Sequence, residues 1–209
     1  MRFLVLLLAA AIGWAGAAKA ADLPLDIFLR DLKTFHSRFT QTVVDSRGAR
    51  IDASKGTLSV VRPGKFRWEV QADDNGEGGQ LLVADGRNLW FYDRDLSQVT
   101  VKPADSALPA TPAMLLSGAD VRSAFKLTDA GRRDGLSWTH LEPARPDADF
   151  RGALLGFGTR GLERMIVEDK LGQTATVNFI DPVRNGPVDD SVVRFTPPAG
   201  VDVIGKPAL

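Results

Sequence analysis

Few groups of residues in this sequence have the types and spacing that catalysis or cofactor binding requires. Residues 156–161, GFGTRG, spell the G-x-G-x-x-G pattern of dinucleotide-binding sites, and Asp181 follows twenty residues after the last glycine. Such a site needs a strand before the pattern and a helix after it. Residues 162–168 are too short for that helix before Gly172 and resemble a strand. The pattern therefore favours a glycine-rich hairpin turn.

An acidic run at residues 73–78, DDNGEG, resembles the beginning of a calcium-binding loop. The twelfth position of such a loop holds a bidentate glutamate. Ala84 occupies that position here. We therefore expect a solvated turn at residues 73–79, and we expect neither a metal nor another cofactor.

Catalytic signatures are also missing from the sequence. His36 and His140 are the only histidines, and neither belongs to an H-E-x-x-H motif; no G-x-S-x-G motif occurs. Acid–base catalysis by two carboxylates that meet at strand ends stays open as an alternative, although nothing in the sequence singles out such a pair. The sequence predicts that the protein is not an enzyme.

The first twenty residues have the pattern of a secretory signal peptide. Arg2 precedes the apolar run FLVLLLAAAIG, and Ala18-Lys19-Ala20 is a small-residue cleavage signal. A transmembrane anchor is the alternative, but the run is short for about 30 Å of hydrocarbon. We expect cleavage after Ala20, with a cut after Ala17 as the lesser option. The mature protein would then be one domain of residues 21–209.

Composition narrows the class of the mature protein. The full chain has 26 basic and 26 acidic residues, and removal of Arg2 and Lys19 leaves a small negative charge, which does not favour binding to nucleic acid. The sequence has no cysteine. This excludes disulfides, thiol catalysis, cysteine–zinc sites and the cysteine-linked lipid anchor of bacterial lipoproteins. A free, monomeric exported protein with a sizeable core is expected.

Strand patterns dominate the mature sequence. Apolar spacing predicts a helix over residues 22–35, capped by Asp22 with Pro24 in the first turn, and short helices at 113–116 and 119–124. Alternation and turn residues predict about ten antiparallel strands and a D-G hairpin at Asp85-Gly86. The strand-like segments from which these strands are expected are 39–43, 57–62, 65–70, 81–84, 88–92, 97–101, 125–128, 137–142, 153–157, 162–168, 174–180 and 192–196. A mainly β barrel or sandwich is expected.

Aromatic residues are concentrated in two of these strands. Phe66, Trp68, Trp90, Phe91 and Tyr92 crowd neighbouring segments. An ordinary hydrophobic core is the simplest interpretation, and a binding cavity formed by that core is the alternative. The residues alone leave both interpretations open.

Six blocks of residues resemble the outer-membrane lipoprotein carrier family (LolA). They keep the family's order over nearly the whole mature chain: residues 35–43, FHSRFTQTV; 62–68, RPGKFRW; 82–93, LVADGRNLWFYD; 98–100, QVT; 111–116, TPAMLL; and 195–201, FTPPAGV. The resemblance implies an incomplete, half-open antiparallel β-barrel covered by a lid of short helices, with some α-helix beside the β-structure. This sequence departs from the family pattern in two places, a longer loop at residues 73–79 and a short or absent C-terminal extension.

The resemblance also implies a function and its residues. Proteins of this family are periplasmic chaperones that accept acylated lipoproteins from an inner-membrane ABC transporter, shield the acyl chains, and deliver them to the outer membrane, often to an acceptor protein. By motif, Arg62 is the latch that holds the lid closed, and Met114, Leu115 and Leu116 form a lid helix. The acyl-chain cavity is assigned to Phe66, Trp68, Leu58, Val60, Val70, Val83, Trp90 and Phe91. A lipid- or glycolipid-binding sensor of the same fold is the alternative.

Overall fold

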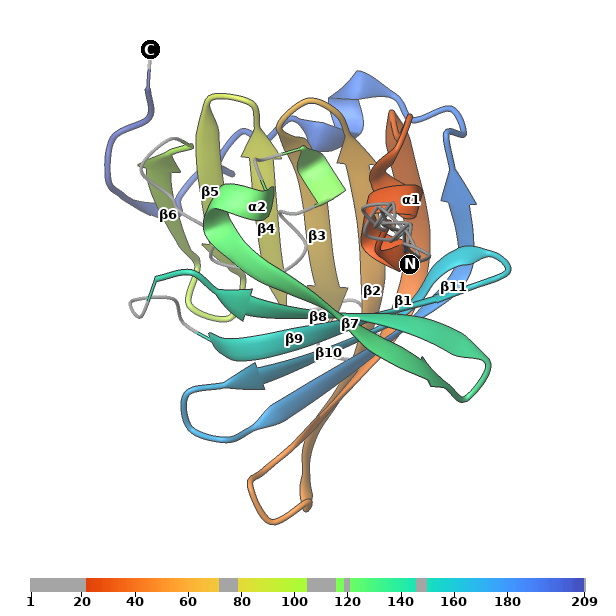
Figure 1. Cartoon of the computed structure of the whole chain (residues 1–209). Coiled ribbons are helices and arrows are strands. Elements are labelled where there is room, and N and C mark those ends of the chain that lie inside the picture. The colour runs from red at the N-terminus through yellow and green to blue at the C-terminus, as the bar shows by residue number, and fades with distance from the viewer. Residues whose placement is uncertain (1–21, 72–78, 105–115, 119–120, 146–149, 209) are drawn as a thin grey trace, which may run out of the picture.

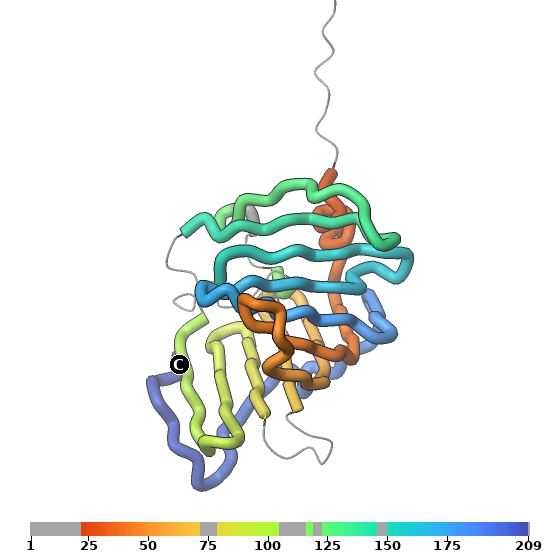
Figure 2. The backbone as a smooth tube through the Cα atoms, turned by 90° about the horizontal axis from the view of Figure 1, so that it is seen from below, coloured from red at the N-terminus to blue at the C-terminus, as the bar shows by residue number. Residues whose placement is uncertain are grey.

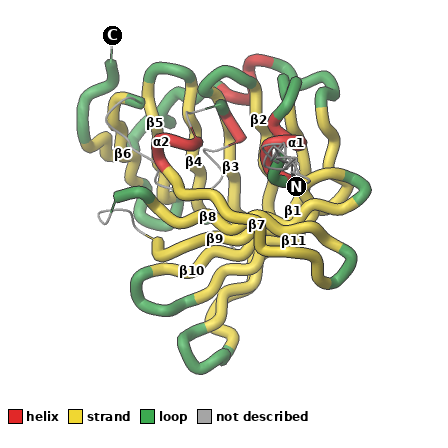
Figure 3. The backbone as a smooth tube through the Cα atoms, in the orientation of Figure 1, coloured by secondary structure: helices red, strands yellow, loops and turns green. Residues whose placement is uncertain are grey.

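The computed structural model of the protein describes residues 22–71, 79–104, 116–118, 121–145 and 150–208 (Figure 1). Strands predominate in these residues, and helices are short (Figure 3). No helix in the described part of the chain is long and apolar enough to cross a membrane. The elements are α1 (Pro24–Leu29), β1 (Thr34–Val44), β2 (Arg50–Val61), β3 (Lys65–Gln71), β4 (Gln80–Asp85), β5 (Asn88–Asp93), β6 (Gln98–Pro103), α2 (Val121–Ala124), β7 (Phe125–Arg133), β8 (Leu136–Pro143), β9 (Phe150–Gly158), β10 (Gly161–Asp169), β11 (Thr174–Arg184), the 3₁₀ turn η2 (Asp190–Val193) and β12 (Asp202–Ile204).

All twelve strands of the described residues belong to one open sheet. Their order is β12-β6-β5-β4-β3-β2-β1-β11-β10-β9-β8-β7, and the two edge strands do not pair with each other. Neighbouring strands are antiparallel, except that β12 runs parallel to β6. Figures 1 and 2 show that the sheet bends strongly and that α1 and α2 lie on the inside of the bend.

The main hydrophobic core lies on this inner side. Leu25 and Phe28 of α1 pack there with Phe35 and Phe39 of β1, and all four are buried. Isolated helices of six residues are not stable in water. Burial of each such side chain contributes about 1.5–3 kcal/mol, so this packing stabilises α1. The backbone amide of Leu25 also donates a hydrogen bond to Thr139 Oγ1 of β8 over 3.2 Å.

A second, smaller core lies on the outer side of β4–β6. Its buried members are Leu81, Val83, Trp90, Val99 and Val101, and the half-buried Tyr92, Phe195 and Val201 pack against them. Phe195 and Val201 come from the C-terminal segment, which Figure 1 shows passing behind these strands. The sheet therefore carries apolar side chains on both faces in this region, one face directed to each core.

The predicted first helix is too long. The helix ends at Leu29, and Phe35 belongs to β1. Leu32 and Phe35 are buried in the main core, so their helical spacing reflected burial and not a continuous helix. Pro24 occupies the first turn as predicted, but Asp26, and not Asp22, accepts a hydrogen bond from the amide of Leu23 at the helix start.

The strand predicted at residues 192–196 is also wrong. The structure forms η2 there, and the Asp189 carboxylate accepts a hydrogen bond from the amide of Ser191 over 2.7 Å. Val193 is buried, and that burial produced the strand-like pattern. Strand β12 was not predicted because its residues are exposed. The glycine pattern at 156–161 forms the hairpin turn between β9 and β10, as predicted.

Candidate functional site

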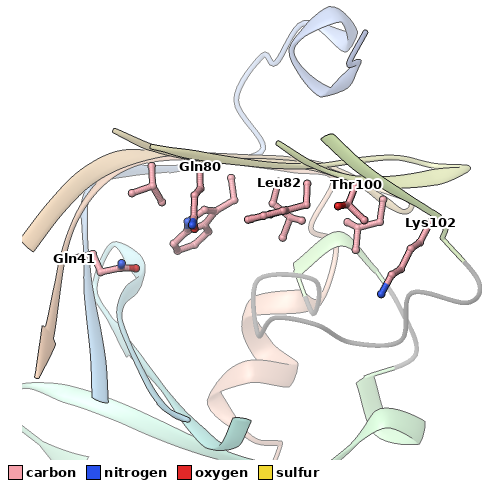
Figure 4. Close-up of a pocket in the computed structure, with 9 residues that line it drawn as sticks. Gln41, Gln80, Leu82, Thr100 and Lys102 are labelled. Carbon is pink, nitrogen blue, oxygen red and sulfur yellow. The ribbon is translucent and has the colours of Figure 1, made fainter. Parts of the chain in front are cut away.

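A pocket of about 420 Å³ opens on the inner face of β3–β6 (Figure 4). Cross-strand pairing explains its composition, because paired residues in neighbouring strands share a face. Trp68 pairs with Leu82, Leu82 with Phe91, and Phe91 with Thr100, which forms one row across four strands. The complete lining is Gln41, Trp68, Val70, Gln80, Leu82, Leu89, Phe91, Thr100 and Lys102. The size falls within the range of roughly 300–1,000 Å³ that is common for ligand pockets.

Three of the predicted cavity residues line this pocket: Trp68, Val70 and Phe91. Phe91 is 36% exposed although it is large and apolar, so it offers an open contact surface. The rings of Trp68 and Phe39 stack at 4.4 Å between centroids, and this contact fixes the indole at the end of the pocket.

Another three predicted residues lie beside the pocket on the same face. Leu58 pairs with Trp68, and Val60 pairs with Phe66. Leu58, Val60 and Phe66 are fully buried in the main core. In the structure as it stands these side chains support the pocket-lining residues and are not open to a ligand.

The placement of Val83 and Trp90 in the cavity is wrong. Side chains alternate between the two faces of a strand. Since Leu82 and Phe91 face the pocket, their neighbours Val83 and Trp90 face the outer side, where both are buried in the second core. The Trp90 ring lies 5.7 Å from the ring of Phe195 and its Nε1 donates a hydrogen bond to Asp85 Oδ2 over 2.7 Å.

The predicted latch residue, Arg62, lies where β2 has just ended. One terminal nitrogen of its guanidinium donates hydrogen bonds to the carbonyl oxygens of Leu29, at 3.0 Å, and Leu32, at 3.4 Å. The last carbonyls of a helix have no partner within the helix, and a guanidinium donor supplies one. The side chain of Arg62 therefore connects the end of α1 to the sheet.

The same guanidinium also lies against residues 116–118. A Cβ atom added to Gly118 would lie only 2.8 Å from Arg62 Nε. Close by, the amide of Gly64 donates a hydrogen bond to the carbonyl oxygen of Ser117 over 2.6 Å. Leu116 is buried in the main core. Of the predicted lid-helix residues, Met114 and Leu115 lie outside the described residues, as does the 73–78 run.

A second arginine at α1 was not predicted. Arg184, at the end of β11, donates hydrogen bonds to the carbonyl oxygens of Phe28, at 3.3 Å, and Arg30. Asn185 Nδ2 donates to the carbonyl oxygen of Asp31 over 3.0 Å. The end of α1 and the segment after it are therefore bound both from the end of β2, by Arg62, and from the end of β11, by Arg184 and Asn185. A charged residue at the end of a strand gives no sequence signal for this role.

The polar pocket residues were also missed. Gln41, Gln80, Thr100 and Lys102 face the pocket from β1, β4 and β6. None of these four residues was assigned to the cavity from the sequence, because that assignment was built from apolar and aromatic residues. The signal that would have identified them is register: once Phe91 is placed inside, its partner Thr100 must also point inside.

Two polar side chains outside the pocket, His36 and Glu69, have structural partners. His36 Nδ1 lies 2.9 Å from Ser59 Oγ. Burial raises the pKa of Glu69, but hydrogen bonds and charges from Arg67 and Arg94 outweigh this effect and hold its pKa below the ordinary value. Within the described residues, no group of three or more histidine, cysteine, aspartate or glutamate residues is placed to hold a metal ion.

Comparison with known proteins places the chain among carriers. A family model described as "Outer membrane lipoprotein carrier protein LolA" matches residues 30–196. The outer-membrane lipoprotein carrier protein of Dechloromonas aromatica is 38% identical over 180 residues, covering 86% of this chain and 85% of the relative. That of Methylobacillus flagellatus is 36% identical over 210 residues, covering 99% of this chain and 100% of the relative.

Among solved structures, an uncharacterized conserved protein from Thermus thermophilus has a similar fold. Its TM-score is 0.50 at 13% sequence identity, and the match covers 87% of this chain and 94% of that chain. This likeness concerns the fold alone.

Proposed function

The chain belongs to the LolA family of outer-membrane lipoprotein carrier proteins, and from this membership we propose that the pocket under β3–β6 covers lipoprotein acyl chains. The family consists of periplasmic transport proteins that are not enzymes. The single observation that supports the proposed site best is an apolar row, Trp68, Leu82 and Phe91, open to a pocket on the inner face of the sheet.

The physical need for such a site follows from the cargo. Burying one methylene group is worth about 0.8 kcal/mol, so exposing some forty of them to water costs on the order of 30 kcal/mol. Unassisted release of a multiply acylated protein from a membrane is therefore negligible. Apolar contacts have no preferred direction, so a pocket of this kind can cover the chains and still release them.

In this proposal the bent sheet is an incomplete barrel, and α1, residues 116–118 and α2 act as its lid. The contacts of Arg62 with Leu29 and Leu32, and its proximity to Gly118, support this assignment. A pocket of 420 Å³ suits one drug-sized ligand. Three acyl chains need more room, and opening of the lid would supply it by exposing Leu58, Val60 and Phe66.

The proposed route of the cargo follows the family. A transporter of the inner membrane hands a lipoprotein to the mature protein, residues 21–209, after removal of residues 1–20. The monomeric carrier then crosses the periplasm to an acceptor in the outer membrane. The alternative role, a sensor of lipids or glycolipids, has no observation in its favour, whereas the curated relatives are carriers.

Binding of an uncharged acyl probe tests the site. Phe91→Glu places a carboxylate in the pocket, and Leu96→Glu makes the same change at a side chain that is 69% exposed in the turn after β5. A fluorescent methyl ester of a long-chain fatty acid should bind the wild type and Leu96→Glu equally. The probe should bind folded Phe91→Glu at least tenfold more weakly, because a hydrated charge replaces an apolar contact surface of the site. Equal binding by all three proteins would remove the pocket from the proposal.

A further inference from the structure

Strand β6 carries its polar residues on the side where the neighbouring strands carry apolar ones. On the inner face, one row runs Val60, Phe66, Ala84, Leu89 and Lys102 across five strands. The adjacent row runs Leu58, Trp68, Leu82, Phe91 and Thr100. Both rows begin with fully buried aliphatic side chains on β2 and end with a polar residue on β6.

The outward residues of β6 show the opposite character. Val99 and Val101 are buried in the second core, beneath the C-terminal segment. The alternation Val-Thr-Val-Lys is therefore complete, with the apolar residues outside and the polar residues inside. Packing of the second core explains the two valines, but it does not explain a lysine in the lining of an apolar pocket.

Lys102 lies at one end of the pocket lining (Figure 4). Its side chain is exposed, and in the described part of the chain it belongs to no salt bridge. Lys65 and Lys126, by contrast, lie 3.6 Å from Asp190 and 3.7 Å from Glu142. A lysine can lay its aliphatic stem along apolar surface and keep its ammonium group in water. Lys102 therefore presents a positive charge where the pocket meets solvent.

We propose that Lys102, with the hydroxyl of Thr100 beside it, binds the negatively charged head of a free single-chain acyl ligand, a fatty acid or an alkyl phosphate, and so fixes the direction in which that chain enters the pocket. The acyl chains of a lipoprotein are joined through ester and amide bonds and carry no such charge, so this ligand is a second class of occupant for the same pocket. The inference rests on the proposed acyl-binding function of this pocket. The hydrocarbon would run from β6 towards Trp68 and Val70 on β3, three strand spacings or about 14 Å away. Carboxylate and phosphate heads share the chemistry that this end recognises, since both accept charge-assisted hydrogen bonds.

The test compares a fluorescent long-chain fatty acid with its methyl ester, which differs only in the charge of the head. The measurement is made at pH about 8, where the carboxyl of the fatty acid is ionised. The wild type should bind the acid roughly three- to tenfold more tightly than the ester, as expected for an exposed charge-assisted contact. Raising the salt concentration should reduce this ratio, because exposed charges are screened.

Three variants locate the preference. Lys102→Met keeps the length of the side chain and should bring the ratio to one, because binding of the acid falls while that of the ester does not follow it down. Lys102→Arg should retain the preference. Lys126→Met removes an exposed lysine of β7 and should behave as the wild type. A long-chain alkyl phosphate, measured in competition with the fluorescent acid, should lose affinity on Lys102→Met as the fatty acid does, and free inorganic phosphate should not compete.

The possible results separate this inference from the proposed function. Ester binding without any preference for the acid, or a preference that survives Lys102→Met, would overturn the role of Lys102 and leave the acyl pocket standing. Failure of the wild type to bind the ester would instead refute the acyl pocket itself, and the role of Lys102 with it. Competition by inorganic phosphate alone would show a simple anion site and would also contradict the inference.

Discussion

The guanidinium of Arg62, just beyond β2, donates a hydrogen bond over 3.0 Å to the carbonyl oxygen of Leu29 at the end of α1. The contact joins the sheet to a helix that covers the inside of its bend. A helix of six residues depends on such tertiary contacts for its position. The contact therefore contributes to holding α1 against the sheet.

Replacing Arg62 with leucine should loosen α1 without unfolding the protein. The carbonyls of Leu29 and Leu32 lose a charged donor, while Arg184 still binds those of Phe28 and Arg30. Hydrogen bonds to charged groups contribute about 1.5–3 kcal/mol. Amide exchange in α1 should therefore accelerate roughly tenfold or more. Arg38→Leu, which removes an exposed pair with Asp181, is the control, and equal exchange in the two variants would contradict the latch.

Gly118→Ala should displace the guanidinium of Arg62 from the side of residues 116–118. The residue has φ of +99°, and its new Cβ would lie 2.8 Å from Arg62 Nε. Gly48 has φ of +83° with nothing within 4 Å, so Gly48→Ala measures backbone strain alone, about 1–2 kcal/mol. In urea unfolding, Gly118→Ala should cost about 1–3 kcal/mol more than Gly48→Ala.

The extra cost should disappear when Arg62 is already leucine. Only a clash with the arginine predicts that result in a double-mutant cycle. An unchanged cost of Gly118→Ala in the Arg62→Leu background would show that the guanidinium does not restrain residues 116–118.

The second core should be separable from the pocket. Phe195 packs on Trp90 and Tyr92, with ring centroids 5.7 and 6.0 Å apart, on the outer side of the sheet. Phe195→Ala should lower the free energy of unfolding by about 2–4 kcal/mol, because the side chain is half-buried. Binding of the acyl methyl ester should be unchanged under native conditions. A parallel loss of binding would mean that the two faces are coupled.

Asp85 should contribute to stability at neutral pH. Burial raises its pKa, but hydrogen bonds from Trp90 Nε1 and the amides of Asn88 and Arg87 outweigh burial and lower the pKa below its ordinary value of 3.8. Because the folded-state pKa is lowered, the ionised carboxylate stabilises the fold at pH values above the ordinary pKa of 3.8. This stabilisation is lost as pH falls through the folded-state pKa. Asp85→Asn should therefore lower the urea midpoint near neutral pH.

As pH falls from about 4 through the lowered pKa of folded Asp85, the difference between Asp85→Asn and the wild type should shrink, since the wild-type carboxyl becomes protonated over that range. Urea midpoints measured across this range check the prediction. Curves that stay parallel down to acid pH would show that the charge of Asp85 does not stabilise the turn between β4 and β5.

Alternation and turn chemistry predicted most of the sheet because both are local signals. The Asp85-Gly86 hairpin and the turn between β9 and β10 followed from residues next to each other in the chain. The end of α1 could not be predicted in this way. Phe35 fits the apolar spacing of a continued helix, but it belongs to β1, which packs into the same core as the helix. Tertiary packing, and not local preference, decided that boundary.

The sequence predicted pocket residues correctly only where an apolar or aromatic side chain of a strand does face the inner side of the sheet. Trp68 and Phe91 were found as aromatic residues in strands, and Trp90 was assigned wrongly with Phe91, although adjacent residues of a strand must face opposite sides. The sequence does not show that the outer face is also buried, because Phe195 reaches it from more than a hundred residues away. Lys102 was missed because the sequence does not show that Val99 and Val101, its alternating neighbours in β6, face the outer core and leave Lys102 on the inner face.

Release of lipoproteins from membranes tests the account most directly. The purified mature protein, residues 21–209, is incubated with energised inner-membrane spheroplasts, and the soluble fraction is analysed by size-exclusion chromatography and mass. We expect the wild type and Leu96→Glu to recover lipoprotein as a one-to-one soluble complex, and folded Phe91→Glu to recover almost none. Absence of any soluble lipoprotein with the wild type, or equal recovery with Phe91→Glu, would contradict a carrier that uses this pocket.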